Sequence, residues 1–337
     1  MKKVLITFIF IYPWIIAIAQ LPINQAYQLI KEKSIHRGEA DWQKVDAAFT
    51  EKLSAVKLAK DSINSLVHVF ELMHDYHSQV IYNQNIYANY PDFPDSVFQK
   101  LRPLVVRAQQ ESGKIRTQLL DAEIIYIQVP GIQAQGEEVN EMAQALSDSI
   151  CQYRQLHIKG CIIDLRMNMG GQLAVMLAGL QPLLGNGYLG GGVDLNHKET
   201  KRLELQAGNF QVNQKPMTSI RHLCNDSFGH LPVAVLIGPV TASSGSITAI
   251  AFRHRPNTVF IGEPTADGYS TGNDYFYVAD NLLLNLSTEF SQDREGVIYK
   301  HSVHPDDLIE GKDEFINLDK DAKVRAAIQW LKKATTR

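Results

Sequence analysis

The chain has 337 residues, of which 45% are hydrophobic and 20% are charged, and 33 Lys and Arg against 36 Asp and Glu give a formal net charge of −3. This composition is typical of a globular protein and excludes a disordered, collagen-like or multi-span membrane chain. The near-neutral charge balance also argues against a nucleic-acid scaffold, so the function has to be inferred from a site.

The first residues have the pattern of a secretory signal peptide. Two lysines precede an apolar run over 4–18, and small residues follow where cleavage would occur. The alternative is an uncleaved membrane anchor, but the run contains Pro13 and is shorter than the roughly 20 apolar residues that a span needs. The sequence therefore predicts a signal peptide over 1–19, export to the periplasm or the medium, and no stable membrane span after cleavage.

The cysteines indicate neither a disulfide framework nor a metal site. Cys151, Cys161 and Cys224 cannot all pair with one another, and a domain of this size does not need disulfides. No cysteine or histidine stands near them at the spacing of a zinc finger or ribbon. We therefore expect no metal and no cofactor, and the pairing of the three thiols stays open.

Apolar patterns divide the chain into a helical first part and a mixed second part. Residues 21–79 carry apolar side chains at helical spacing, and the stretch 91–103, rich in Pro, Asp, Tyr and Asn, predicts a loop or linker before a second helical stretch through Val105 and Gln110. After residue 114, β-rich runs alternate with helical ones, which favours an α/β core. The expected strands are 124–129, 161–165, 233–237, 259–261 and 282–286, and the expected helices are 138–153, 173–184 and 244–254. The glycine-rich stretch 185–214 breaks this alternation and predicts a mobile flap or hairpin.

Two strand-to-helix junctions carry residues suited to catalysis. The first ends in Gly170 and Gly171 just before a helix, so that amides point outward where they can bind negative charge. The alternative is a glycine turn selected for backbone geometry alone. Asp164 and Arg166, earlier in the same turn, are expected to pair with each other or to cap the turn.

The second junction places serines at the start of a helix. An apolar run over 233–237 leads into Ser243 and Ser244, followed by helical residues. A hydroxyl at this position lies at the positive end of the helix dipole, and the amide of the next residue can stabilise an oxyanion, so Ser243 is a candidate nucleophile. The alternative is that one of the two serines only caps the helix.

Five short motifs, taken in order, resemble the C-terminal processing, or tail-specific, family of serine peptidases. They are Asp75-Tyr76-His77, the stretch 163–171, Thr241-Ala242-Ser243, Gly262-Glu263-Pro264-Thr265 and Val303-His304-Pro305-Asp306. The resemblance spans most of the chain after the signal peptide. It implies an α/β core of the ClpP/crotonase type over 114–337, preceded by a small helical N-terminal domain and linker over 20–113.

The resemblance also implies the residues of the site. By position, Ser243 would be the nucleophile, and the Ser244 amide with an amide of Gly170 or Gly171 would form the oxyanion hole. Members with a Ser-Lys dyad have a lysine shortly after the Gly-Glu-Pro-Thr motif, and here that lysine is absent. The chain is therefore similar to the lysine-lacking branch that includes the tricorn core, in which a histidine from the N-terminal part is the base, and His77 occupies that position. An imidazole titrates in the range that suits a general base for serine.

Three positions near the proposed site stay open. His74 is a nearby competitor of His77 for the role of base. Glu295 is the nearest acidic candidate for a third residue that would orient the histidine. Ser246 stands three residues after the proposed nucleophile, where the family often has a glutamate.

The stretch between residues 77 and 124 is too short for the peptide-binding PDZ domain of many family members, so we expect no PDZ domain. Substrate would then be held by the core, as an extended peptide added to a sheet edge near Gly170 with the glycine-rich flap as a cover. The sequence predicts an exported serine peptidase that acts on a peptide or protein substrate. The alternatives are a catalytically weak or inactive protein of the same fold that binds a peptide or an apolar ligand, and an esterase with the same nucleophile. The pattern shows no nucleic-acid site and leaves the oligomeric state undetermined.

Overall fold

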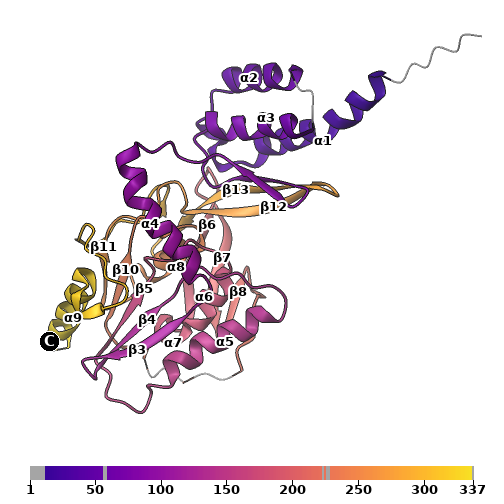
Figure 1. Ribbon diagram of the computed structural model, residues 1–337. Coiled ribbons are helices and arrows are strands. Elements are labelled where there is room, and N and C mark those ends of the chain that lie inside the picture. Colours follow the sequence, from indigo (N-terminus) through magenta and orange to yellow (C-terminus); the bar gives the residue numbers. More distant parts are fainter. Residues whose placement is uncertain (1–11, 56–58, 222–223, 225–227, 336–337) are drawn as a thin grey trace, which may run out of the picture. The chain divides into compact units, whose positions relative to one another are not determined.

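A computed structural model describes residues 12–55, 59–221, 224 and 228–335, in two compact units (Figure 1). The first unit comprises Met1–Pro91 and Asn273–Thr288, and the second comprises Asp92–Gly272 and Glu289–Arg337. Most of the predicted signal peptide, residues 1–11, lies outside the described residues. Within the described ranges, no helix combines the length and the apolarity that a membrane span requires.

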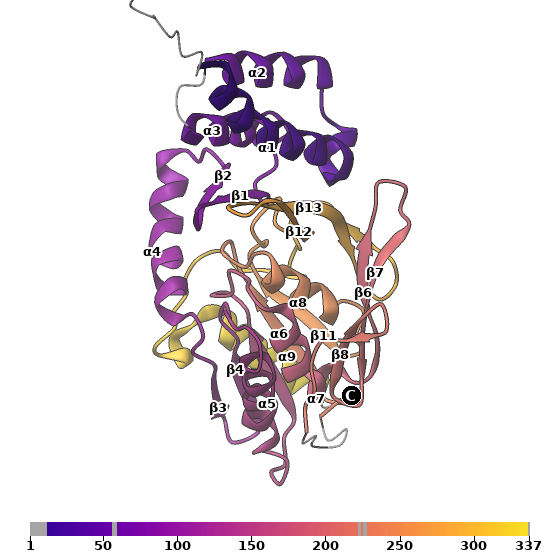
Figure 2. The same ribbon diagram turned by 90° about the vertical axis from the view of Figure 1, so that its right-hand side faces the viewer.

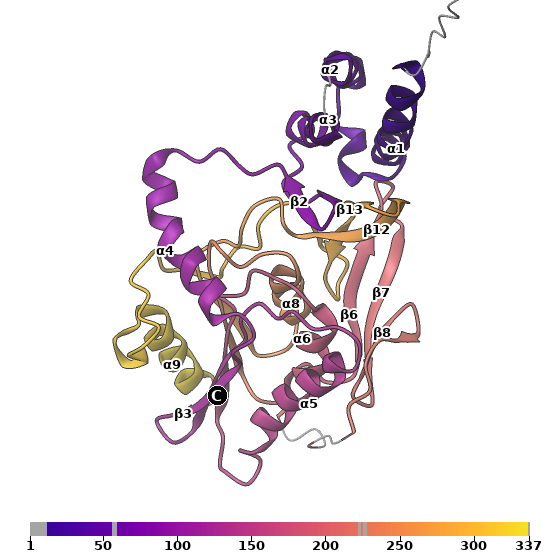
Figure 3. The ribbon, with the colours of Figure 1, turned by 45° about the vertical axis from the view of Figure 1, so that its right-hand side comes forward.

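The first unit packs helices against a small antiparallel sheet (Figure 3). Its elements are α1 (Tyr12–Lys33), the 3₁₀ helix η1 (Ile35–Gly38), α2 (Trp42–Ser54), α3 (Ala59–Leu72), β1 (Gln79–Tyr82), β2 (Asn85–Ala88), most of β12 (Thr271–Ala279) and the first part of β13 (Leu282–Gln292). Strand β1 pairs with β2 on one side and with β13 on the other, and β13 pairs with β12. Ile30 and Phe70 from the helices share one core with Val80 and Leu284 from the sheet. The helical stretch predicted over 21–79 is confirmed up to β1.

A sheet with the strand order β15-β11-β10-β5-β4-β3 forms the centre of the second unit. The strands are β3 (Arg116–Leu120), β4 (Ile124–Gln128), β5 (Gly160–Asp164), β10 (Val233–Ile237), β11 (Thr258–Gly262) and β15 (Asp307–Leu308). All neighbours in this order are parallel except β3, which pairs with β4 in the antiparallel sense at the edge. The central strands β4, β5 and β10 are buried throughout, which is why they appear in the sequence as short continuous apolar runs.

Helices cover both faces of this sheet. One face packs under α5 (Glu138–Cys151), α6 (Leu173–Gly179), α7 (Gln181–Leu184) and α8 (Ser244–Phe252), and the other packs against η2 (Leu318–Lys320) and α9 (Ala322–Ala334) (Figure 1). Successive side chains of a strand point to opposite faces, so Ile125 and Ile163 join the first layer and Ile124 and Ile162 join the second. The predicted α/β alternation is therefore confirmed.

The stretch predicted as a mobile flap or hairpin forms paired strands. They are β6 (Gly187–Val193), β7 (Glu199–Gln206), β8 (Asn209–Val212) and β9 (Lys215–Pro216) (Figure 2). Strand β6 also pairs with the end of β13, and β13 pairs there with β14 (Ile298–Tyr299). The hairpin alternative is confirmed. A Cβ at Gly191 would lie 2.0 Å from the Lys201 carbonyl oxygen, and one at Gly192 would lie 2.1 Å from the Glu289 carboxyl carbon. Close approach of paired strands explains these glycines.

Part of the stretch predicted as a linker is helix α4 (Asp95–Glu111), which contains Pro103. The composition of 91–103 predicted a loop there, and a proline inside a helix also removes one backbone hydrogen bond. The second helical stretch, predicted through Val105 and Gln110, is the later part of this helix. The helix is held by packing, because Ala108 and its neighbours contact Met167 and Val240 in a small apolar cluster. Helix α4 accordingly belongs to the second compact unit, whose boundary falls after Pro91.

Cys151 and Cys224 form a disulfide, with their Cα atoms 5.5 Å apart. The pairing that the sequence left open is therefore Cys151 with Cys224. The two cysteines are 73 residues apart in the sequence, and only the folded chain brings the end of α5 to the segment before β10. Cys161 on β5 is a buried free thiol, and burial raises the pKa of this thiol to about 12, which keeps it unreactive.

Removal of this disulfide by Cys224→Ser is expected to lower the free energy of unfolding by about 2–4 kcal/mol, because the open chain has more conformations when unfolded. Urea unfolding with and without a reductant measures the effect. Cys151→Ser should cost the same, and the double variant should cost no more than either single one, since all three lack the same bond. If wild type is equally stable with and without reductant, the disulfide contributes nothing.

Candidate active site

Ser243 occupies the turn between β10 and α8, in a strained backbone conformation. Its φ is 54° and its ψ is −127°, a combination that residues with a side chain rarely adopt. Although Ser243 stands at the N-cap position, its hydroxyl makes no capping hydrogen bond to α8. The capping alternative is therefore not what the structure shows. A strained serine on a strand-to-helix turn is the arrangement that presents the nucleophile in α/β-hydrolases.

Hydrogen bonds from several segments hold this turn in place. The Ser243 amide donates to the Tyr269 carbonyl at 3.0 Å. Two residues earlier, the Thr241 hydroxyl donates to the Leu165 carbonyl at 2.9 Å and accepts from the Gly238 amide at 3.0 Å. The end of β5, the end of β10 and the segment after β11 therefore fix the position of the serine together.

The loop after β5 lies directly against Ser243. A Cβ at Gly170, whose φ is 103°, would lie 2.6 Å from the Ser243 Cβ, so only glycine fits there. Asn168 links this loop to the serine turn, because its Oδ1 accepts from the Gly170 amide at 2.9 Å and its carbonyl accepts from the Ala242 amide at 2.9 Å. Asn168 is fully buried. Asn168 stood in one of the five sequence motifs, and its role as a link between loop and turn was not predicted.

Two backbone amides near Ser243 have no hydrogen-bond partner among the described residues, namely those of Gly171 and Ser244. The Ser244 hydroxyl donates to the Gly171 carbonyl at 2.7 Å, which holds the two residues side by side. The Gly170 amide is already bound to Asn168. Of the two glycines named for an oxyanion hole, Gly171 is therefore the one with an amide available.

The positions left open in the sequence have partners of their own. The buried Ser246 hydroxyl donates to the Thr241 carbonyl at 3.3 Å, so it supports the turn in place of a carboxylate. The exposed Glu295 carboxylate lies 3.7 Å from Nδ1 of His254. Its histidine neighbour is thus a different residue from His77.

His77 lies in the first unit, in a segment organised by Asp75. The fully buried Asp75 carboxylate accepts hydrogen bonds from the His77 amide at 3.1 Å and from the Ser78 hydroxyl at 2.5 Å. The Asn273 side chain donates to the His77 carbonyl at 3.1 Å. The competitor His74 is exposed and has a φ of 52°. The buried, hydrogen-bonded segment around His77 favours His77 over the exposed His74 as the candidate base.

The environment of His77 keeps its imidazole neutral. Burial lowers the pKa of His77 from 6.5 to about 4; nearby Asp75 opposes this shift, and His36 adds to it. A neutral imidazole has the lone pair that a general base needs. Because His77 and Ser243 belong to different compact units, their pairing stays a prediction.

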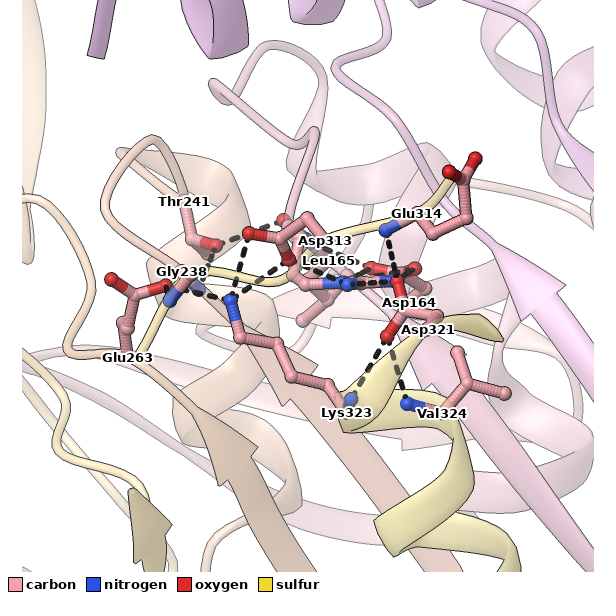
Figure 4. Close-up of polar contacts among 12 residues, drawn as sticks. Asp164, Leu165, Gly238, Thr241, Glu263, Asp313, Glu314, Asp321, Lys323 and Val324 are labelled. Carbon is pink, nitrogen blue, oxygen red and sulfur yellow. Dashed lines mark hydrogen bonds and ion pairs between the residues drawn. The ribbon is translucent and has the colours of Figure 1, made fainter. Parts of the chain in front are cut away.

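A buried cluster of charged side chains lies beneath the serine turn (Figure 4). Arg166, at the end of β5, pairs with Asp164 at 2.6 Å, Asp313 at 2.6 Å and Asp321 at 2.8 Å. Burial by itself raises the pKa of Asp164, but the Arg166 guanidinium and the hydrogen bonds from Arg166 and Tyr126 outweigh it and hold that pKa below its usual value. The predicted pairing of Asp164 with Arg166 is therefore observed.

A second cation completes the cluster. The ammonium of Lys323, which is fully buried, lies 2.6 Å from the Glu263 carboxylate and 2.8 Å from that of Asp313 (Figure 4). Asp321 caps α9 through the amides of Lys323 and Val324. The start of α9 is thus tied to the ends of β5 and β11, the strands on either side of β10. No pattern in the sequence connects Asp313 or Lys323 with Arg166, more than 140 positions away.

Among the described residues, no group of three or more His, Cys, Asp or Glu side chains is placed to hold a metal ion. The polar groups around Ser243 are hydroxyls, amides and carbonyls. These groups are suited to acyl transfer through a nucleophile and an oxyanion hole.

The sequence profile of Peptidase family S41 matches residues 123–309. This stretch covers more than half of the chain and contains Ser243, Gly170 and Gly171, whereas His77 lies outside it. The chain therefore belongs to peptidase family S41, and the resemblance to the C-terminal processing peptidases is confirmed.

One curated relative and two solved structures show how far the similarity extends. The nisin-resistance protein of Lactococcus lactis subsp. lactis is 31% identical over 214 residues, which cover 63% of this chain and 61% of that protein. The match thus spans less than two thirds of the relative's length. A lipoprotein from Streptococcus agalactiae aligns with a TM-score of 0.70 at 21% identity and covers 99% of this chain and 100% of its own. The photosystem II D1 C-terminal processing protease aligns with a TM-score of 0.56 at 12% identity, covering 92% and 97%.

These structural similarities show the fold alone, and they confirm the predicted α/β fold class. The described residues between β2 and β4 form only α4 and β3, so no PDZ domain is evident there.

Proposed function

We propose that the chain is an exported serine peptidase in which Ser243 attacks the carbonyl carbon of a peptide bond. The observation that carries the proposal is the strained backbone of Ser243, held by the ends of β5 and β10 and the segment after β11 inside an S41 domain, while its hydroxyl does not cap the helix. Strain of this kind costs about 1–3 kcal/mol and persists where function requires the geometry.

In the proposed mechanism, neutral His77 accepts the hydroxyl proton as the Ser243 oxygen attacks. The negative charge that develops on the carbonyl oxygen accepts hydrogen bonds from the Ser244 and Gly171 amides, and loss of one such donor typically costs about 2.7–4 kcal/mol of barrier. His77 then gives the proton to the leaving amine. Water, activated in the same way, hydrolyses the acyl-enzyme and restores the serine. No third residue that orients His77 is assigned.

The proposed substrate is a peptide or protein outside the cytoplasm. The name of the Lactococcus relative connects that protein with resistance to nisin, and the Streptococcus structure is described as a lipoprotein. Export of the present chain is supported by its predicted signal peptide and by the Cys151–Cys224 disulfide, since disulfides persist mainly in oxidising compartments. Nisin and unrelated peptides are suitable first substrates to compare.

Labelling with a fluorophosphonate tests the proposal and separates it from a ligand-binding protein of the same fold. We expect one adduct per chain, mapped by mass spectrometry to the peptide that contains Ser243. Heat-denatured protein is the control and should not react. An absence of labelling in folded protein would favour the binding alternative, and turnover of esters without peptides would favour the esterase.

The pH dependence of the same labelling reports on His77. Because the pKa of His77 lies at about 4 rather than 6.5, we expect the rate to persist at pH 5 and to decline with a midpoint near 4. The lowered pKa also contributes to folding stability above pH 6.5, and this contribution is lost as pH falls from 6.5 through 4, since the unfolded chain takes up the proton first. Near-UV circular dichroism at each pH separates the two effects. A midpoint near 6.5 in folded protein would contradict the assignment.

A further inference from the structure

The free edge of the central sheet in the second unit borders a groove of about 700 Å³. Residues from α4, β3, β4 and the segment before η2 line it. Arg116 and Gln118 of β3 lie opposite Gln128 and Tyr126 of β4, so the groove lies over one face of the sheet, and the consecutive residues 115–118 carry it to the strand edge. Strand β3 has β4 on one side and no strand on the other among the described residues. An unpaired edge of this kind offers backbone donors and acceptors to an added strand.

Polar groups in the groove lack partners. Gln128 is only 4% exposed, and its carboxamide makes no hydrogen bond with any described residue. The Arg107 guanidinium pairs with no carboxylate in the described chain, and its buried Nε has no hydrogen-bond partner. Arg116, by contrast, is paired with Glu111 at 2.6 Å. The groove therefore has one uncompensated positive charge and one carboxamide that makes no hydrogen bond with the described residues.

The Arg107 side chain is held in place although its charge is unpaired. Its guanidinium lies over the Phe315 ring, 4.8 Å from the centroid, and Arg166 lies 4.6 Å from the same ring. Ile316, which follows in this wall of the groove, is 82% exposed. A fixed guanidinium beside an exposed apolar side chain is suited to a carboxylate attached to an apolar group.

We propose that this groove binds an extended peptide that adds a strand to β3, with a carboxylate of the peptide on Arg107 and a main-chain group on Gln128. The carboxylate comes from the chain terminus or from an acidic side chain, and both have the same chemistry. The groove lies toward the α9 face of the sheet, because Tyr126 and Gln128 share that face, whereas α8 covers the opposite one. The site is therefore separate from the proposed catalytic residues and does not depend on their activity.

Binding of defined peptides to the full chain tests this proposal, with Ser243→Ala as the background so that no probe is cleaved. The probes are an N-acetylated hexapeptide of alternating threonine and valine with a free terminal carboxylate, its terminal amide, and the amide with aspartate as the fifth residue. Calorimetry measures affinity, and hydrogen exchange followed by mass spectrometry locates the bound peptide. We expect the free acid to bind, to slow exchange over residues 116–120, and to bind about tenfold or more tightly than the plain amide.

Variants of the groove make the test specific. Arg107→Gln should weaken binding of the free acid about tenfold or more and remove its advantage over the amide. Gln128→Leu should weaken acid and amide alike. Arg102→Gln, which removes an exposed arginine of the same helix outside the groove, should change neither. Tight binding of the aspartate amide would assign the carboxylate to a side chain, and weak binding would assign it to the chain terminus.

Three results would overturn the proposal. The first is that neither carboxylate probe binds, and the second is that the acid and the amide bind equally. The third is that a bound peptide slows hydrogen exchange over 165–171 or 241–245 but not over 116–120. Thermal unfolding of each variant confirms that the fold is intact, and Gln128→Leu gives an independent readout should Arg107→Gln be unstable. Since fluorophosphonate labelling reports on Ser243 alone, a failure of this proposal is distinguishable from a failure of the proposed peptidase activity.

Discussion

Replacing Ser243 by alanine is expected to reduce kcat for peptide hydrolysis by roughly 10⁴- to 10⁶-fold, as found when a serine nucleophile is removed from a catalytic site. The variant should fold normally, because alanine and serine meet the same steric restriction at positive φ and the Ser243 backbone contacts with Tyr269 and Ile247 do not need the hydroxyl. Substrate affinity, measured by calorimetry on the inactive variant, should change little.

Ser244→Ala is the matched control for this loss, because it removes the hydroxyl of the adjacent residue and leaves its amide in place. The variant loses the hydrogen bond to the Gly171 carbonyl, so we expect a loss of about 0.5–1.5 kcal/mol in stability and a much smaller decrease in kcat than for Ser243→Ala. Fluorophosphonate labelling should persist. Full activity of Ser243→Ala, or loss of labelling only in Ser244→Ala, would move the nucleophile to the neighbouring serine.

Arg166→Met is expected to lower the free energy of unfolding by about 3–5 kcal/mol, a large part of the 5–15 kcal/mol typical of a folded domain. The substitution keeps much of the side-chain volume but leaves the buried Asp164 and Asp321 carboxylates without their cation. Because the pKa of Asp164 is held low by the guanidinium and would rise without it, the difference from wild type should be largest at neutral pH and smaller toward pH 4. Urea unfolding at several pH values measures both effects.

Arg202→Met is the matched control, since Arg202 also contacts two carboxylates, Glu204 at 3.1 Å and Glu199 at 3.6 Å, but its side chain is 42% exposed. Solvent screens such pairs, so we expect a loss of less than about 1 kcal/mol. If Arg166→Met does not fold, Arg166→Lys keeps the charge and should be intermediate. Equal stability of Arg166→Met and wild type would show that the cluster does not hold the ends of β5 and β11.

Local sequence patterns predicted the elements that carry the proposed site. Strands β4, β5, β10 and β11 appear as short apolar runs because both of their faces are buried, and the helices between them show helical spacing. Ser243, Gly170 and Gly171 could be named because a turn from strand to helix has recognisable local chemistry. The first part of helix α4 was missed because its composition, including Pro103, is typical of a loop, whereas packing on Met167 and Val240 holds the helix.

Features that depend on residues far apart in the chain could not be predicted. The cluster around Arg166 requires Asp313 and Lys323, and the disulfide requires Cys151 and Cys224 to meet across 73 residues. The glycines of β6 suggested mobility, because the sequence does not show that neighbouring strands and the Glu289 side chain lie too close to leave room for a Cβ.

By itself, the sequence determined the α/β alternation, the serine turn and the membership of a peptidase family, because each depends on residues that are neighbours along the chain. The tertiary structure alone decided which cation neutralises which buried carboxylate, which cysteines join, and which arginine at the edge of the sheet keeps an unpaired charge. Such pairings form only when folding brings distant segments within a few ångströms, and no local pattern encodes that distance.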